Sequence, residues 1–426
     1  MKSQDFRAVS LILIFAVLPV WASNQQGQQV QLVTLSDYLS YAALNNAHLK
    51  SKFQQWKAAL EEVPQAKALE DPKFTYGYFI EEVETRVGPQ KNRFGIMQVF
   101  PWFGTIEART DAASAKAKAA QKHYDAAKLE LFRDVKRGFY EYAYLGTAVE
   151  IAKDNLELLE QFEEVARSKY RTATAGHPDI IRAQIELAKL EDILKSLEAL
   201  KEPTIAGLNA VLNRPAGADL PWPQQIELQT MTINRQQVID MLIKNNPELA
   251  GLDWQIEAAR SEVELAKKKF YPNIGVGVDW IQTDDAITPG VRDSGKDPVV
   301  LMFSMNIPLW SESYKAGERQ AQANVLKTQE QKIDTENELI AKVFDVVYDI
   351  EDSERKLQLY GNILIAKAQE LVQTSETAYK AGNLDFLSLI DAQRMLLNYN
   401  LDYQRAKTNY HQKVAELEAV VGTELN

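Results

Sequence analysis

The chain of 426 residues repeats one pattern of motifs twice, and this duplication constrains its fold more than any other feature. The segment at residues 45–49 (Asn-Asn-Ala-His-Leu) recurs 200 positions later at 245–249 (Asn-Asn-Pro-Glu-Leu). Residues 170–184 match residues 379–393 at a separation of 209. Matches in the same order, at a slowly growing separation, indicate two copies of one structural plan with small insertions.

Each copy begins with a predicted helix rich in Ala, Leu, Glu and Lys, at 35–69 and again at 235–269. Two segments follow in which apolar side chains alternate with small or polar ones, which is typical of strands with one apolar face. These segments predict β-hairpins at about 72–101 and 271–308, with polar loops at 83–91 and 283–296. Taken alone, they could also form small hairpins outside a membrane.

A very long helix is predicted after each hairpin. In the first copy, residues 106–171 contain no proline and carry apolar residues at three- and four-residue steps. At 1.5 Å per residue, roughly 65 residues would span roughly 100 Å. Return helices are predicted at 178–200 and 386–421. We therefore divide the chain into a signal peptide at 1–22, repeat 1 at 23–215, a linker at 216–232 and repeat 2 at 233–426.

The first residues predict export from the cytoplasm. Lys2 and Arg7 precede an apolar run at 9–20, and Ala22 offers a small residue before a cleavage site. Beyond Ala22 no run of 18 apolar residues remains, so we expect no membrane-spanning helix, and entry into a membrane would require a β-barrel. The net charge of −11 disfavours nucleic acid as a partner.

Two predicted hairpin tips resemble a known family. Residues 379–382 (Tyr-Lys-Ala-Gly) and 386–394 (Phe-Leu-Ser-Leu-Ile-Asp-Ala-Gln-Arg) are similar to the tip signature of the TolC family of outer-membrane efflux proteins. The first tip matches it at 179–184 (Asp-Ile-Ile-Arg-Ala-Gln), with Ala173 where the second has Gly382. Together with the duplication and the proline-flanked strand pairs, the resemblance covers essentially the whole chain after the signal peptide.

The resemblance implies a homotrimer whose chains form an α-helical barrel and a twelve-stranded β-barrel. Part of this follows from physics, because four strands leave two open edges that lipid cannot satisfy, whereas several chains can close the ring. The expected fold is therefore mainly α with a membrane β-barrel portion. It is built from a duplicated helix–β-hairpin–long helix–helix repeat.

The implied function is an exit duct of a tripartite efflux or type I secretion system, in the outer membrane of a Gram-negative bacterium and extending into the periplasm. The implied partners are a periplasmic adaptor (membrane fusion) protein, an inner-membrane pump of the RND type and outer-membrane lipid. The exposed tips around Gly176 and Gly382 would dock the adaptor. Residues 98–104 and 385–387 look like the branch that serves heavy-metal cation pumps, while drugs, dyes and secreted polypeptides stay open as cargo.

The resemblance also implies that acidic side chains near the tips close the duct. Asp391 and Asp385 match these positions, and a ring of carboxylates at a constriction favours cations. In the repeat alignment Arg182 lies opposite Asp391, which suggests an Arg182–Asp391 pair between neighbouring hairpins in the closed state. The alternative is that these groups, Asp179 among them, are solvated charges at the starts of the return helices.

No pattern in the sequence favours an enzyme. There is no cysteine, and the four histidines never stand at the spacing of metal ligands on one helix face. No nucleophile elbow or phosphate-binding loop occurs, so we expect no catalytic, cofactor or metal site. Two other classes stay open, a periplasmic coiled-coil adaptor and a structural coiled coil. Both predict a protein that is soluble without detergent.

Overall fold

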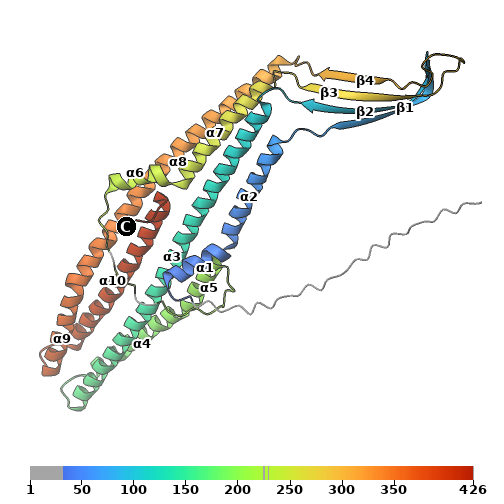
Figure 1. The fold of residues 1–426 in the computed structure, drawn as a ribbon. Helices are drawn as coiled ribbons and strands as arrows, with labels where there is room; N and C mark the ends of the chain where they lie inside the picture. The colour runs from blue at the N-terminus through green and yellow to red at the C-terminus, as the bar shows by residue number, and fades with distance from the viewer. Residues whose placement is uncertain (1–31, 224–225, 229, 426) are drawn as a thin grey trace, which may run out of the picture.

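The computed structural model of the chain describes residues 32–223, 226–228 and 230–425, so the expected signal peptide at 1–22 lies outside the described residues. The molecule is elongated. A four-stranded sheet forms one end, and long helices run from it to the other end, where two tight turns each connect a pair of helices (Figure 1). Among the described residues, none of the helices combines the length and the apolar character needed to cross a bilayer.

Each repeat opens with two helices where the sequence predicts one. The prediction of single helices at 35–69 and 235–269 is wrong, because the backbone leaves the helical conformation at Asn46 and Asn246, with ψ angles of 126° and 121°. The observed helices are α1 (Leu35–Asn45) and α2 (Ala47–Lys67), then α6 (Arg235–Asn245) and α7 (Pro247–Lys268).

The two asparagines at these breaks make the same contacts in both repeats. The Asn46 side chain accepts a hydrogen bond from the backbone N–H three residues ahead at 2.9 Å, and Asn246 does so at 3.0 Å, which caps the following helix. Their amides donate to the carbonyls of Val211 and Val420, at 2.8 and 2.7 Å. Each asparagine thus ties the start of its helix to the last helix of the same repeat.

The strands form one antiparallel sheet in the order β1-β2-β3-β4. They are β1 (Lys73–Thr85), β2 (Gly88–Phe100), β3 (Ile274–Thr283) and β4 (Val299–Met305), within the stretches predicted as hairpins. Because β2 pairs with β3, the hairpins of the two repeats join directly, and β1 and β4 are left as open edges.

The prediction of a loop at 83–91 is wrong. β1 and β2 continue through it, and only Arg86 and Val87 separate them. Gly88, with a φ of +133°, makes this short turn possible, because a Cβ there would collide with the Asp284 carbonyl. The polar side chains of this segment therefore belong to the ends of two strands, not to a loop.

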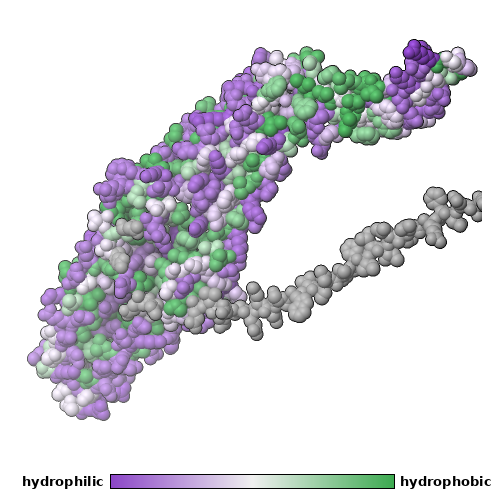
Figure 2. All heavy atoms as spheres, viewed as in Figure 1, coloured by the Kyte–Doolittle hydropathy of each residue, from purple (hydrophilic) through white to green (hydrophobic). Residues whose placement is uncertain are grey.

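The strand register gathers apolar side chains of all four strands on one face of the sheet. Tyr76 lies opposite Phe94 and Phe94 opposite Trp280, with ring centroids 5.2 and 5.3 Å apart. Phe94 is partly buried between its neighbours, whereas Tyr76 and Trp280 are exposed, as is Phe303 of β4 by 72%. In Figure 2 the half of the sheet nearest the helices is green, and its far end is purple. A continuous exposed apolar surface of this kind marks contact with a partner or a membrane.

The opposite face of the sheet carries small and polar side chains. A Cβ added to Gly95 would lie 2.3 Å from a carboxylate oxygen of Asp279, and one added to Gly275 would lie 2.2 Å from the Ser304 hydroxyl. Asp279 is buried and forms an ion pair with Arg93 on the same face. Glycine at these positions leaves room for close neighbours, as on the inside of a strongly curved sheet.

One uninterrupted helix leaves the sheet in repeat 1. It is α3 (Thr105–Arg171), whose 67 residues correspond to about 100 Å, and it confirms the helix predicted at 106–171. In repeat 2 the same path is divided into α8 (Ser311–Leu359), a π-helical turn η1 (Tyr360–Leu364) and α9 (Ile365–Ala381). A π-helical turn accommodates an extra residue within a helix, and repeat 2 has this turn where α3 of repeat 1 continues as a regular α-helix.

The return helices are α4 (His177–Ala199), α5 (Lys201–Leu212) and α10 (Phe386–Val421). The helices predicted at 178–200 and 386–421 are confirmed, but α5 was not predicted. The break between α4 and α5 precedes Pro203, which has no N–H to donate to the Ala199 carbonyl and whose ring crowds that carbonyl. α10 contains no proline and continues.

The segment between α5 and α6 is fastened to the two long helices α3 and α10. The Tyr142 hydroxyl of α3 donates to the Leu220 carbonyl at 2.8 Å, and the Met231 N–H donates to the Tyr410 hydroxyl of α10 at 2.9 Å. Both tyrosines belong to hydrophobic clusters, one shared by α1, α3 and α5 and one by α6, α8 and α10.

Candidate gate and docking tips

The end of the molecule opposite the sheet holds all six residues predicted for gating and docking. Tip 1 is the turn from α3 to α4, and tip 2 is the turn from α9 to α10 (Figure 1). The glycines lie exposed in these turns, and the charged residues lie in the first two turns of α4 and α10 or just before them: Gly176, Asp179 and Arg182 at tip 1, and Gly382, Asp385 and Asp391 at tip 2.

The two turns have the same backbone shape although one uses alanine and the other glycine. Gly382 ends α9 in the left-handed conformation, with a φ of 81°, and Ala173 adopts a φ of 57° at the corresponding position. In both turns the next N–H reaches back five residues, from Thr174 to the Lys169 carbonyl and from Asn383 to the Ala378 carbonyl, each at 2.9 Å. This hydrogen-bond pattern closes a helix end in a defined direction.

The helices that leave the two turns begin differently. The Asp385 carboxylate caps α10 by accepting from the backbone N–H of Ser388 at 2.9 Å and from its hydroxyl at 3.0 Å. These hydrogen bonds hold the pKa of Asp385 below its ordinary value. Gly176 takes the same place before α4 and offers no side chain for a cap. Asp385 therefore stabilises the start of α10. This agrees with the alternative given above, in which the acidic groups are charges at the starts of the return helices.

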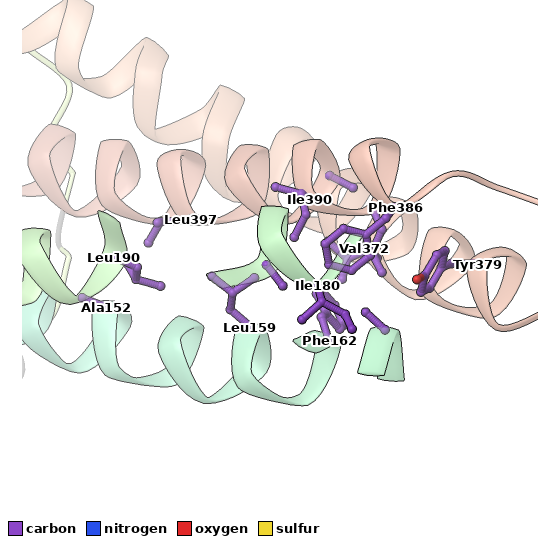
Figure 3. Close-up of a cluster of buried hydrophobic side chains, with 14 residues drawn as sticks. Ala152, Leu159, Phe162, Ile180, Leu190, Val372, Tyr379, Phe386, Ile390 and Leu397 are labelled. Carbon is purple, nitrogen blue, oxygen red and sulfur yellow. The ribbon is translucent and has the colours of Figure 1, made fainter. Parts of the chain in front are cut away.

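A shared hydrophobic core joins the two tips. In Figure 3, Phe162 of α3, Ile180 of α4, Val372 of α9 and Phe386 of α10 converge on one another. Phe162 and Phe386 are 1% and 0% exposed. All four helices contribute to this core, so the tips of both repeats form one packed unit within a single chain.

Polar contacts also connect tip 1 to tip 2. The Lys169 ammonium in the last turn of α3 donates to the carbonyls of Tyr379 and Lys380 at the end of α9, at 3.1 Å for Lys380. The carbonyls at a helix end attract such a cation. The Tyr379 hydroxyl in turn donates to Asp179 on α4 at 3.3 Å. Burial, together with the Asp179 charge, raises the pKa of Tyr379, so the hydroxyl keeps its proton at neutral pH.

Arg394 on α10 makes a two-point contact with Glu186 on α4. Its Nε donates to one carboxylate oxygen at 2.9 Å, and its Nη2 pairs with the other. Its Nη1 donates to Asp391 at 3.0 Å. Arg394 holds the pKa of Glu186 below its ordinary value, and the Glu186 carboxylate raises the pKa of Arg394. Asp391, Arg394 and Glu186 thus form a chain of charges from repeat 2 to repeat 1.

The predicted Arg182–Asp391 pair does not form within the chain. The nearest carboxylate to Arg182 among its ion pairs is Asp179 on its own helix, at 3.6 Å, and Asp391 is bound to Arg394. The side chains of Arg182 and Asp391 are 49% and 47% exposed. A pair between neighbouring subunits stays a prediction.

The residues that join the two tips were not predicted from the sequence. Tyr379 and Arg394 lie inside the two segments that resemble the family's tip signature, 379–382 and 386–394, so their position in that signature was a signal. Lys169 and Glu186 carried no signal, because their partners lie more than 200 residues away in the chain. Ile185 occupies the position of Arg394 in repeat 1, so the duplication itself does not mark the contact.

The chemistry available at the tips consists of ion pairs and hydrogen bonds. In the part of the chain that the structure describes, no three His, Cys, Asp or Glu side chains lie close enough together to hold a metal ion. Contacts of this kind are reversible, so they can hold neighbouring helices together or release them.

Comparison with known proteins gives this geometry a context. A protein-family model described as "Outer membrane efflux protein" matches residues 38–208 and 238–423, which is most of the chain and follows its two repeats. The chain is similar to nodulation protein T of Rhizobium leguminosarum bv. trifolii, with 21% identity over 76% of this chain and 70% of the relative. It is also similar to the cobalt-zinc-cadmium resistance protein CzcC of Cupriavidus metallidurans, with 18% identity over 96% of this chain and 93% of the relative.

A solved structure shares the fold. The outer membrane protein VceC of Vibrio cholerae superposes with a TM-score of 0.75, at 17% identity, over 92% of this chain and 97% of that chain. The similarity extends from the sheet to the helical tips, since it covers nearly all of both chains.

Proposed function

This chain belongs to the outer membrane efflux protein family, and from that premise we propose that three copies assemble into one duct through the outer membrane and the periplasm. The protein is a channel of the Gram-negative outer membrane, the exit of a tripartite efflux system, and it is not an enzyme. Family membership removes the alternatives of a periplasmic adaptor and of a structural coiled coil.

The main support for the proposed trimer is that the sheet of one chain has two open edges. β1 and β4 lack a partner on their outer sides within the described chain, and one face of the sheet is apolar and exposed. Pairing β4 of one copy with β1 of the next would satisfy both edges. Three copies give twelve strands, with the apolar face toward lipid and the glycine-rich face inside. β1 and β2, with 13 residues each, are long enough to cross a tilted barrel wall.

The same assembly would surround a helical tunnel. In each copy α2, α3, α7 and α8 run from the sheet toward the tips (Figure 1). We propose that repeat 1 (23–215) and repeat 2 (233–426), joined by the linker at 216–232, each contribute equivalent helices to its wall.

We propose that the tips are both the gate and the docking surface. Asp391 and Asp385 would surround the opening together with Asp179 and Arg182, and a ring of partly exposed carboxylates there would favour cations. The exposed turns at Gly176 and Gly382 would meet the tips of a periplasmic adaptor, which connects the duct to an inner-membrane pump of the RND type. Outer-membrane lipid surrounds the other end, and nucleic acid has no part in the assembly.

The cargo we propose is a heavy-metal cation. Residues 98–104 and 385–387 support this cargo, because they resemble the branch of the family that serves heavy-metal cation pumps. The similarity to the cobalt-zinc-cadmium resistance protein along 96% of this chain supports it as well. A drug or a secreted polypeptide is the competing cargo, because the pump selects the substrate.

Membrane fractionation and sizing test the assembly. The full chain, expressed with its first 22 residues, should be found in the outer-membrane fraction and run in mild detergent as a trimer that heat dissociates. A monomer in the soluble periplasmic fraction would contradict the proposed assembly.

Single-channel recording in a planar bilayer tests the gate. Asp391→Ala should raise the conductance, because it removes a carboxylate of the proposed constriction and one of the contacts of Arg394. Asp240→Ala, an exposed aspartate on α6 far from the tips, serves as the matched control. If the two variants conduct like the unchanged protein, Asp391 is not part of the gate.

A further inference from the structure

The row of long helices in one chain has two open flanks. α2 packs on α3, α3 on α7 and α7 on α8, so α2 and α8 are the outer members of the row (Figure 1). The strands follow the same order, with β1 after α2 and β4 before α8 as the outer members. The open flanks of the helices therefore continue the open edges of the sheet.

The contact between α3 and α7 shows how a helix of repeat 1 meets a helix of repeat 2. Glu262 of α7 forms an ion pair with Lys116 of α3 at 2.5 Å. Further along, the Gln255 amide nitrogen lies 2.9 Å from Nε2 of His123. Residue numbers rise along α3 while they fall along α7, so the two helices run antiparallel.

α2 carries the same residues as α7 on the side by which α7 meets α3. Asn46 and Asn246 occupy the same place in the two repeats and set the separation at 200. Three residues that recur at this separation lie three or four positions apart, so they share one helix face: Gln55, Ala58 and Glu62 match Gln255, Ala258 and Glu262. In α2 all three are exposed, whereas in α7 this face meets α3. An open face with the residues of a covered one indicates a partner of the same kind.

The free side of α8 corresponds to the side by which α3 meets α7. Buried residues of the two helices match at a separation of 208, such as Val135 with Val343 and Tyr142 with Ile350. Because both helices are regular over this stretch, the same separation holds toward the sheet. The α3 residues next to α7 are Lys116, Ala119, Lys122 and His123, and their counterparts in α8 are Asn324, Lys327, Glu330 and Gln331. All four counterparts are exposed.

The charges of the two open flanks are complementary. Residues 47–60 of α2 include no acidic residue and three lysines, namely Lys50, Lys52 and Lys57. Residues 330–338 of α8 include four acidic residues and one lysine, Lys332, which pairs with Asp253 of α7 at 2.6 Å. An antiparallel contact that brings residue 331 beside residue 55 places these two segments side by side. Opposite charges facing each other favour such a contact and fix its register.

We propose that α2 of one copy packs against α8 of the next copy, antiparallel and in the register that α7 and α3 adopt within one chain. Gln55 would then lie beside Gln331 of the neighbouring copy, and Glu62 beside Asn324. This inference rests on the proposed trimer and names the helix contact that closes its tunnel. The contact between copies is more polar than the one within a chain, since Lys327 stands where α3 has a buried alanine.

A designed disulfide tests the register, because the sequence contains no cysteine of its own. Within a chain, a Cβ on Gly251 would lie 3.4 Å from the Cβ of Lys122, and disulfides join Cβ atoms about 3.5–4.5 Å apart. Ser51 and Glu330 hold the same places in α2 and α8. The double variant Ser51→Cys/Glu330→Cys, purified in mild detergent and oxidised, should therefore migrate as a covalent trimer after heating without reductant. Reduction should return it to a monomer.

A shifted pair of cysteines serves as the matched control. Asn337 is also exposed and lies further along the same side of α8, about 10 Å from Glu330. Ser51→Cys/Asn337→Cys should therefore form no link between copies. A trimer in which the first pair fails to link, or in which the shifted pair links instead, would overturn the register but leave the proposed duct standing. The absence of any trimer before oxidation would overturn both.

Discussion

At tip 1 an alanine holds a backbone conformation that tip 2 leaves to a glycine. Ala173 has a φ of 57° and Gly382 a φ of 81°, and the hydrogen bonds around them are the same. The left-handed conformation costs a residue with a Cβ about 1–2 kcal/mol relative to glycine. The closed helix end and the core beneath it hold Ala173 in place against that cost.

Ala173→Gly should therefore stabilise the protein by about 0.5–1 kcal/mol, once the greater freedom of glycine in the unfolded chain is subtracted. Denaturant unfolding followed by helical circular dichroism measures the change. Gly382→Ala should have the opposite effect, since no atom lies near a Cβ there and only the conformation matters. Gly317→Ala, inside α8, is the control and should be neutral or stabilising. A destabilised Ala173→Gly variant would contradict this account of the turn.

His411 should make stability depend on pH. Burial lowers its pKa to about 4 in the folded protein, below the ordinary value of 6.5. Between these values the unfolded chain binds a proton that the folded chain does not, so stability is complete above pH 6.5 and falls as the pH drops toward 4. The loss should be on the order of 2–3 kcal/mol.

Unfolding free energies at pH 6.5 and 4.5 test this dependence. His411→Phe, which keeps a ring against Tyr140, should lose clearly less stability over that interval than the unaltered protein. Equal losses in the two proteins would mean that other groups are responsible.

Among the elements, those whose formation depends on local pattern were predictable. Residues 106–171 lack proline and keep an apolar spacing, and they form the helix α3 as predicted. The break at Asn46 was not predictable in this way, because the side chain that caps α2 is fixed by Val211, 165 residues away in the chain. The same limit applies at the tips. The motif indicates where they lie, but only the packed structure brings Arg394 to Glu186.

The two faces of β4 should respond differently to a new charge. Leu301 lies on the exposed apolar face, and its neighbour Val300 lies on the face of Asp279. Leu301→Arg should lower the amount of trimer in the outer membrane, since arginine facing lipid costs about 2–4 kcal/mol near the bilayer centre. Val300→Arg is the control and should assemble. Heat-dissociable trimer in membrane fractions is the readout, and equal yields would count against the assignment of the faces.

The π-helical turn should be the least protected part of the long helical path in repeat 2. Its backbone hydrogen bonds deviate from the α pattern at Tyr360–Leu364, and Gly361 packs closely on Tyr403. Hydrogen–deuterium exchange should be faster there than at residues 151–155, the corresponding turn of α3 in repeat 1. Equal protection of the two segments would show that the turn is as stable as a regular helix.

In the molecule as a whole, the two repeats are joined at both ends. β2 pairs with β3 at one end, and Lys169, Tyr379 and Arg394 connect the tips at the other. Opening the tips of a single chain therefore requires that contacts between its own repeats be broken, in addition to any contacts between subunits.

Arg394→Gln should ease that opening and raise the channel conductance. The contact is worth about 1 kcal/mol or somewhat more, because Glu186 is largely buried while the Arg394 side chain is 41% exposed. Glu186→Gln should act in the same direction, and the double variant should add little to either single change. Arg355→Gln, an exposed arginine paired with Asp352 on α8, is the control. Fully additive effects would mean that the two residues act separately.

The interruption of the helical path in repeat 2 has a mechanical consequence. α3 passes from the sheet to tip 1 without a break, so it resists bending along its whole length like a strut. In repeat 2, η1 divides the path and concentrates compliance at one joint about a quarter of the way back from tip 2. The two repeats therefore differ in bending stiffness although their sequences follow one plan. A lateral force on both tips would bend the α8–η1–α9 path at η1 before it bends α3.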